Sequence, residues 1–178
     1  GRELVLRLCE GADAIVENYR GGVMDRLGLG YEALHERFPK LVYATIRGFG
    51  DWRTGRSPYT DWPAYDVVAQ AFGGVMAITG PDKETPMKVG PGIGDLMPAT
   101  MCAVGIVSAI LRAHKTGKGQ LVDVGMVDAI LSLCERIVHQ HSYTGGIPVP
   151  EGNHHPLLCP FGMFPAKVPT LDVRSVGA

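Results

Sequence analysis

The hydrophobic and polar positions of the first fifty residues alternate between helical spacing and short β-branched runs. Residues 1–13 place three leucines and a valine where one helical face would gather them, and this helix is expected to end near Gly11. The short apolar run at 14–18 predicts a buried strand. The nearly continuous apolar run at 41–49 is typical of a strand in a parallel sheet that is covered on both faces.

The same alternation continues along the chain. The segment between the two strands predicts two short helices, broken at Gly28 and Gly30. Alternating helices and strands favour an α/β domain in which a parallel sheet is layered with helices. Further elements are expected in this order: a loop at 50–63, a helix at 64–78, a glycine-rich loop, a long apolar helix from Asp95 to about Lys115, a strand at 121–126 and an amphipathic helix at 127–143.

Composition narrows the classes of partner and environment. The net charge of −1 offers no basic surface for nucleic acid or an anionic membrane. The apolar stretch from Leu96 to Leu111 is shorter than the ~20 residues that span a bilayer, so we expect a buried core helix. The chain starts with Gly1 directly in a helical pattern, which suggests a piece of a longer protein. Four scattered cysteines without a CxxC pair predict reduced thiols in a cytoplasmic protein: Cys9, Cys102, Cys134 and Cys159.

The sequence VGPGIGDLMPAT (residues 89–100) places three glycines before one carboxylate, Asp95, at the start of the long helix. An aspartate in this place most often caps the helix by accepting a backbone N–H. Pro98 would occupy the third helical position, where it has no N–H to offer, so lone pairs of the carboxylate stay free. The alternative is a nucleophile, since glycines let a ligand approach and can aim N–H groups at an oxyanion. Position alone leaves both interpretations open for the junction formed by Gly90, Gly92, Gly94 and Asp95.

A second group of polar residues follows the first predicted strand. Asn18, Tyr19 and Arg20 lie at its carboxyl end, the edge at which open α/β sheets bind ligands. Arg20 and Arg26 are candidates for holding phosphates, although surface arginines are usually only solvated.

Other candidates are weaker. Tyr65 and Asp66 start a later helix, where an aspartate is more often a cap than a catalytic group. The histidines do not predict a metal site, because His139 and His141 are spaced for opposite sides of a helix. A dinucleotide-binding GxGxxG motif would need a glycine where Asp95 stands.

Six stretches of the chain occur in a fixed order over residues 1–167: ADAIVENYRGGVMDRLGLGYEAL, PKLVYATIRGFG, PAYDVVAQAFGGVMAITG, VGPGIGDLMPAT, KTGKGQLVDVGMVDAIL and GNHHP. Together they resemble the family III CoA-transferases of the CaiB/BaiF type, which include formyl-CoA:oxalate CoA-transferase and carnitine CoA-transferase.

The resemblance implies a mechanism in which Asp95 matches the aspartate nucleophile of the family. Its carboxylate would attack an acyl-CoA thioester, giving a mixed anhydride and CoA thiolate. The thiolate would return to form an aspartyl-CoA thioester, from which CoA passes to an acceptor acid. CoA and acyl-CoA are then substrates, and no permanently bound cofactor or metal is expected. By the same resemblance, CoA contacts are expected from Asn18, Tyr19, Arg20 and Arg26, with Tyr65 and Asp66 lining the site near the thioester.

The resemblance also implies an architecture. Residues 1–145 would belong to a large Rossmann-like CoA-binding domain that carries Asp95, and residues 146–178 to an irregular linker toward a smaller domain. Family members are longer, and two of their two-domain chains interlock as a dimer. The fold is therefore expected to be incomplete relative to the family, and the full-length protein to be a homodimer acting on acyl-CoA and a small carboxylic acid.

Two alternatives stay open beside the transferase. The α-methylacyl-CoA racemases share the resemblance, but their pattern has a histidine base where Tyr65 stands, and a phenol is a poor base near neutral pH. The other alternative is a catalytically inert fragment. The acyl donor and acceptor are not identified by the sequence. Loops tolerate change and carry function, so the segment 46–63 is expected to contribute to acceptor choice, with Arg47, Arg53 and Arg56 as candidates to meet the acceptor carboxylate.

Overall fold

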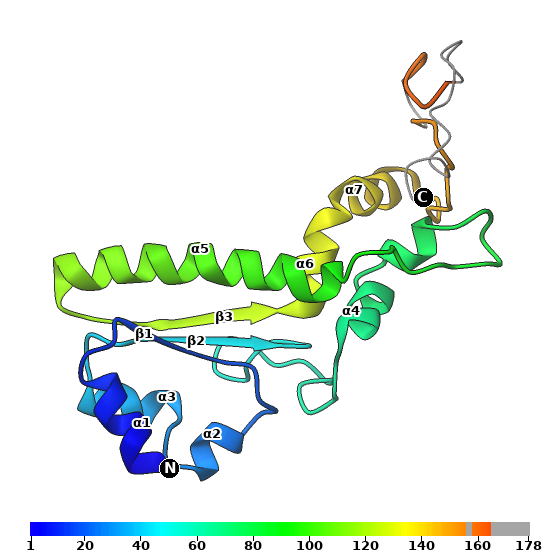
Figure 1. Ribbon diagram of the computed structural model, residues 1–178. Helices are drawn as coiled ribbons and strands as arrows, with labels where there is room; N and C mark the ends of the chain where they lie inside the picture. The colour runs from blue at the N-terminus through cyan, green and yellow to red at the C-terminus, as the bar shows by residue number, and fades with distance from the viewer. Residues whose placement is uncertain (156–157, 165–178) are drawn as a thin grey trace, which may run out of the picture.

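A three-stranded parallel sheet organises the molecule, as the sequence predicts (Figure 1). The computed structural model describes residues 1–155 and 158–164. The strands are β1 (Ala14–Glu17), β2 (Val42–Arg47) and β3 (Leu121–Gly125), and β2 lies in the middle. The central place of β2 explains its nearly unbroken apolar sequence, because both of its faces are covered.

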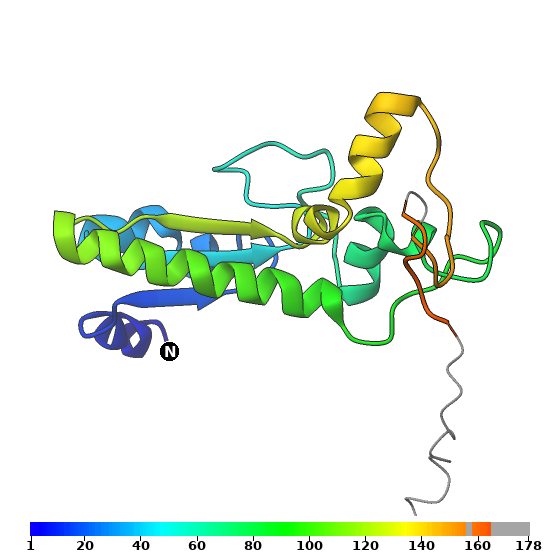
Figure 2. The ribbon, with the colours of Figure 1, turned by 90° about the horizontal axis from the view of Figure 1, so that it is seen from above.

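Helices cover the two faces of the sheet unequally (Figure 1). Three short helices lie on one face: α1 (Arg2–Cys9), α2 (Val23–Arg26) and α3 (Tyr31–Arg37). The long helix α5 (Ile93–Thr116) lies on the other and runs along the strands (Figure 2). Alternate residues of β2 serve the two sides, since Tyr43 belongs to the core with α1 and α3 whereas Val42 packs with Ala109 and Ala113 of α5.

The edge strand β1 differs from its prediction. We expected a buried strand, but Val16 is 53% exposed. Within the described residues β1 pairs only with β2, so one side of the strand lacks a neighbour.

Two predicted helices are each interrupted. The helix expected at 64–78 is split into α4 (Asp66–Phe72) and the 3-10 helix η1 (Val75–Ile78), because Gly74 adopts a φ of 91° that a helix cannot continue through. The helix expected at 127–143 is likewise α6 (Met126–Leu133) followed by α7 (Glu135–Thr144), with a break at the buried Cys134. After the break α7 runs away from the sheet (Figure 1).

Helix α5 is longer than its prediction. It starts two residues before Asp95 and spans 24 residues, so its length and composition are those of a helix able to cross a membrane, and the length argument made from the sequence is wrong. Part of the helix lies against the sheet, since Ala109 and Ala113 of α5 pack with Val42 of β2. The expected burial is also wrong for one face, on which four apolar side chains are exposed: Leu96, Val104, Val107 and Leu111.

The cysteines are free thiols, as predicted. Cys9, Cys102 and Cys134 are buried, and burial raises the pKa of each of these three thiols. Of the irregular segment predicted at 146–178, the described part has no helix or strand and only an isolated bridge between His154 and Gly162. Residues 156–157 and 165–178 of that prediction lie outside the described residues.

Candidate functional site

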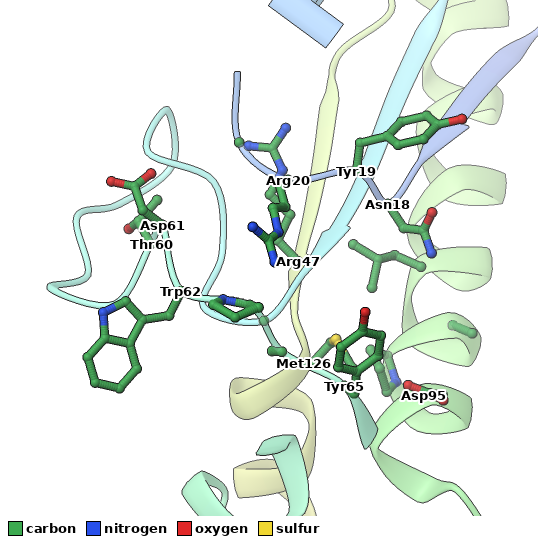
Figure 3. A pocket seen from close by; sticks show the side chains of 17 residues that line it. Asn18, Tyr19, Arg20, Arg47, Thr60, Asp61, Trp62, Tyr65, Asp95 and Met126 are labelled. Carbon is green, nitrogen blue, oxygen red and sulfur yellow. The ribbon is translucent and has the colours of Figure 1, made fainter. Parts of the chain in front are cut away.

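A cleft of about 530 Å³ opens at the carboxyl ends of β1 and β2 (Figure 3). Parallel strands end at one edge of the sheet, so the turns that follow them converge there. Five parts of the chain supply the lining: the turn after β1, the end of β2, the loop before α4, the first turns of α5 and the start of α6. The lining residues include Asn18, Tyr19, Arg20, Arg47, Trp62, Tyr65, Asp95 and Met126.

Asp95 is exposed in the first turn of α5 and lines the cleft. It is the third residue of the helix, and the N-cap position is Gly92, so the capping role that its sequence position favoured is wrong. Pro98 is the sixth helical residue rather than the third, which removes the reason given for a free carboxylate. The carboxylate is nevertheless free, because no hydrogen bond or ion pair engages it among residues 1–155 and 158–164.

The electrostatics of this position favour anions. The first backbone N–H groups of a helix have no partner within the helix, and the aligned peptide dipoles add partial positive charge at the same end. At the start of α5, however, the first four N–H groups already have acceptors. Ile93 N donates to Pro91 O, Gly94 N to Asp66 Oδ1 at 2.7 Å, and Asp95 N and Leu96 N to Gly92 O. The helix dipole therefore favours an anion here, but these N–H groups are not free to bind an oxyanion.

The turn after β1 presents Asn18, Tyr19 and Arg20 to the cleft with their side chains exposed. Glu17 fixes the start of this turn, because its carboxylate accepts Tyr19 N at 2.8 Å while pairing with Arg47 at 2.8 Å. Tyr65 projects from the opposite wall next to Asp95 (Figure 3). The structure thus brings together five of the seven candidate residues of the sequence.

The other two candidates lie beside the cleft rather than in its lining. Arg26 is exposed on α2, and its guanidinium lies near Gly22 of the preceding turn. Asp66 is the first residue of α4, and its carboxylate faces α5, where it accepts hydrogen bonds from Gly94 N and from Gln70 Nε2. Asp66 is therefore occupied by protein contacts.

The arginines expected to meet an acceptor carboxylate are committed elsewhere. Arg47 is buried at the cleft floor, and its guanidinium pairs with Glu17 and with Asp51. Arg53 pairs with Asp51 and with two carboxylates outside the cleft, Asp25 and Glu32. Arg56 lines a separate cavity of about 430 Å³. Arg47 thus lines the cleft with both Nη atoms bound to carboxylates, whereas Arg53 and Arg56 are not in the cleft lining. Contact of these side chains with an acceptor stays a prediction.

Several residues at the site were not predicted from the sequence. Trp62 lines the cleft and packs edge-on against Tyr59, which in turn contacts Phe72 of α4. Gln70 is fully buried next to Asp66. Its signal was present in the sequence as a glutamine four residues after an aspartate on one helix, a spacing at which side chains meet.

No group of three or more metal-ligating side chains occurs within the part of the chain that the structure describes. The expectation of a metal-free site stays a prediction.

Comparison with known proteins assigns this arrangement to a family. The model of CoA-transferase family III matches residues 1–171. The chain is 50% identical over 165 residues to succinyl-CoA:mesaconate CoA-transferase of Haloarcula hispanica, which covers 93% of this chain and 42% of that protein. It is 40% identical over 167 residues to acetyl-CoA:oxalate CoA-transferase of Acetobacter aceti, again with coverage of 93% and 42%.

Solved structures agree with the fold. A CaiB/BaiF family protein from Brucella suis superimposes with a TM-score of 0.82 at 34% identity, covering 91% of this chain and 42% of that one. The chain therefore spans about 42% of the length of the first of these curated relatives and of this structural neighbour.

Proposed function

The chain belongs to CoA-transferase family III, and from this premise we propose that the protein transfers CoA between an acyl-CoA thioester and a carboxylic acid through a covalent intermediate on Asp95. The observation that carries the proposal is the exposed carboxylate of Asp95, which has no partner among the described residues and lies in the cleft at the N-terminus of α5.

The proposed reaction begins with attack of an Asp95 carboxylate oxygen on the thioester carbonyl carbon. The C–S bond breaks, and the products are a mixed anhydride and CoA thiolate. The thiolate then attacks the Asp95 carbonyl carbon of the anhydride, which gives an aspartyl-CoA thioester and releases the donor as its free carboxylate. An acceptor carboxylate repeats the two steps in reverse and leaves with CoA, which regenerates Asp95.

The residues around Asp95 support binding of the CoA moiety. Arg20 is exposed and makes no ion pair within the described residues, so its guanidinium is available to a phosphate oxygen. Asn18 and Tyr19 offer an amide and an aromatic ring beside it. Arg26 lies behind the glycine turn, where it extends the positive charge toward a longer ligand.

CoA is a substrate in this proposal, and no resident cofactor takes part. We further propose that the intact protein is a cytoplasmic homodimer. We also propose that it acts on acyl-CoA and small carboxylic acids, which are the substrate classes named for its relatives.

The test is mass spectrometry of the intact protein after incubation with a panel of acyl-CoA thioesters. We expect a mass increase of one CoA less one water, present in the parent and in Asp82→Ala, and absent in Asp95→Ala. Asp82 is a suitable control because it is an exposed aspartate in the loop before α5. An adduct that persists in Asp95→Ala would reject Asp95 as the nucleophile. A folded parent without any adduct would reject the covalent mechanism, and deuterium uptake at the α-carbon of an acyl-CoA would favour the racemase.

A further inference from the structure

We propose that Asp66 is a positioning residue, which caps the N-terminus of α5 from a neighbouring helix and thereby holds Asp95 in place. The inference rests on the proposed function, because it assigns to Asp66 the placement of the proposed nucleophile. It replaces the role of ligand contact that the sequence suggested for Asp66.

The hydrogen bonds of the Asp66 carboxylate carry the proposal. Gly94 N donates to Asp66 Oδ1 at 2.7 Å, and Gly94 directly precedes Asp95 in the chain. Gln70 Nε2 donates to both carboxylate oxygens of Asp66, at 2.9 and 3.0 Å. Helix α5 has no cap from its own N-cap residue Gly92, so the carboxylate of Asp66 supplies the acceptor that the helix start lacks.

Gln70 extends the same chain of hydrogen bonds to the glycine-rich loop. Its Oε1 accepts Val89 N at 2.9 Å, and the side chain is fully buried between the loop and α4. The segment 89–94 is therefore fixed at both ends by two side chains of one helix, Asp66 and Gln70. A buried side chain with both ends of its amide occupied has little freedom to rearrange.

The approach of α4 to α5 is also too close for any residue but glycine at position 94. A Cβ added to Gly94 would overlap the carbonyl oxygen and Cα of Asp66. Direct contact between the two helix starts means that a shift of Asp66 is transmitted to the backbone next to Asp95. A displacement of about 1 Å at a reacting group can lower a rate about 100-fold.

The direction of each hydrogen bond makes a rescue experiment possible. In Asp66→Asn, the amide oxygen can still accept Gly94 N and Gln70 Nε2, but the new NH₂ group replaces the Oδ2 acceptor that lies 3.0 Å from the NH₂ group of Gln70. Gln70 cannot turn over, because its oxygen is needed by Val89 N. The double variant Asp66→Asn with Gln70→Glu restores the order, since the residue 70 carboxylate accepts both from the residue 66 amide and from Val89 N.

The experiment compares three variants with the intact parent protein. We expect Asp66→Asn to lower the rate of adduct formation at saturating acyl-CoA about 10- to 100-fold, while the Kd for CoA stays within about twofold. The double variant is expected to recover to within about threefold of the parent. Glu3→Gln, the same change in the first turn of α1 on the far face of the sheet, is the control and should behave as the parent does.

A second readout, independent of activity, is amide hydrogen exchange of the segment 89–94. We expect faster exchange in Asp66→Asn and parental exchange in the double variant. An unchanged adduct rate in Asp66→Asn, or a loss of CoA affinity in place of rate, would overturn the positioning role. Failure of the double variant to restore either rate or protection would do the same. If the parent forms no adduct, the proposed function fails, and the exchange data alone decide whether Asp66 holds the segment.

Discussion

The guanidinium of Arg47, at the end of β2, connects the end of β1 to the loop that follows β2. It pairs with Glu17 at the end of β1 and with Asp51 in the loop after β2, and all three side chains are buried. Because Glu17 also accepts Tyr19 N, the ion pairs reach the turn that presents Asn18 and Arg20. A buried arginine is thus structural here.

Replacing Arg47 with methionine is expected to lower the free energy of unfolding by about 3–5 kcal/mol. The reason is that Glu17 would remain buried without its cationic partner, while Asp51 would keep only Arg53. Urea denaturation at pH 7 measures the loss, with the exposed Arg112→Met as the matched control. A loss below about 1 kcal/mol would show that water or a rearranged side chain compensates for the missing guanidinium.

The ion pair between Arg53 and Glu32 predicts a pH dependence. Two hydrogen bonds from Arg53, at 2.6 and 2.7 Å, hold the pKa of the Glu32 carboxyl below its usual 4.5. A carboxyl whose pKa is lower in the folded state stabilises above its unfolded pKa, and this contribution disappears as the pH falls through the folded pKa. The stability difference between the parent and Glu32→Gln should therefore be present at pH 7 and vanish toward pH 3.

Thermal unfolding of both proteins across that pH range tests the prediction, and Glu36→Gln on the same helix is the control. Glu32 is 62% exposed, so the expected effect is small. A difference that is constant from pH 7 to pH 3 would show that charge plays no part in it.

Residue types could be predicted from the sequence, but residue partners could not. Asp95, Asn18 and Arg20 were identified because they stand next to glycines or at a strand end, both of which are local features. The pairing of Arg47 with Glu17 depends on the register that sets Glu17 opposite Thr45, and no local pattern encodes that register. The ion pairs of Arg53 with Asp25 and Glu32 likewise join residues more than twenty positions apart, so no local pattern indicated them.

At the scale of single elements, α5 positions Asp95, which lies in its first turn. The other end of the helix is defined by Gly117. Gly117 ends the helix with a φ of 73°, and its N–H donates to Ala113 O at 2.8 Å. A glycine in this conformation just after the last helical turn is a common way for a helix to end, and it lies close to the end expected near Lys115.

Gly117→Ala is expected to lower the free energy of unfolding by about 1 kcal/mol, since a Cβ disfavours the left-handed conformation. Gly117→Asn should cost less, because asparagine tolerates that region better than alanine. Chemical denaturation of the two variants measures the order. Equal stability of alanine and asparagine would contradict the conformational explanation.

Element boundaries were predictable only where a residue forces them. Gly28 and Gly30 separate α2 from α3 as expected, whereas Gly74 was overlooked within an apolar run. The break at Cys134 has no breaker in the sequence and coincides with the burial of its side chain, which is a tertiary effect. Tertiary packing of this kind overrides local propensity.

At the scale of the whole molecule, one apolar cluster connects the sheet to α4 and α5, the helices that carry Asp66 and Asp95. Ala69 of α4 packs with Met126 and Ile130 of α6, and Ile46 of β2 and Ile93 of α5 lie against them. The cluster thus holds the helices that carry Asp66 and Asp95 against each other and against the sheet.

Ile130→Ala is expected to lower the free energy of unfolding by about 2–5 kcal/mol, because the side chain is fully buried and its removal leaves a cavity. Leu131→Ala, at a position that is 44% exposed on the same helix, should cost much less. Urea denaturation of the two variants makes the comparison. Equal losses would show that the cluster around Ile130 relaxes to fill the space.

The overall class was predictable because the α/β alternation and the ordered motifs extend along most of the chain. The exposed apolar face of α5 was not, since a hydrophobic helix looks the same in sequence whether one or both of its sides are covered. The donor and acceptor acids were not predictable either. This chain spans about 42% of the length of its relative from Haloarcula hispanica, so the cleft is formed by only that part of such a protein.

The contact of Tyr59 and Trp62 with Phe72 has a consequence for how this protein could diversify. Those rings pack the end of the loop at 50–63 against α4, and Trp62 lines the cleft together with Tyr65. Insertions near Gly55 would lengthen the chain on the far side of that anchor, leaving Tyr65 and Asp66 where they are. A two-residue insertion after Gly55 should leave the Kd for CoA within about twofold, since loops absorb such changes at low cost. Evolution or grafting can then change the loop tip, which lines the separate cavity of about 430 Å³, while Tyr65 and Asp66 keep their places.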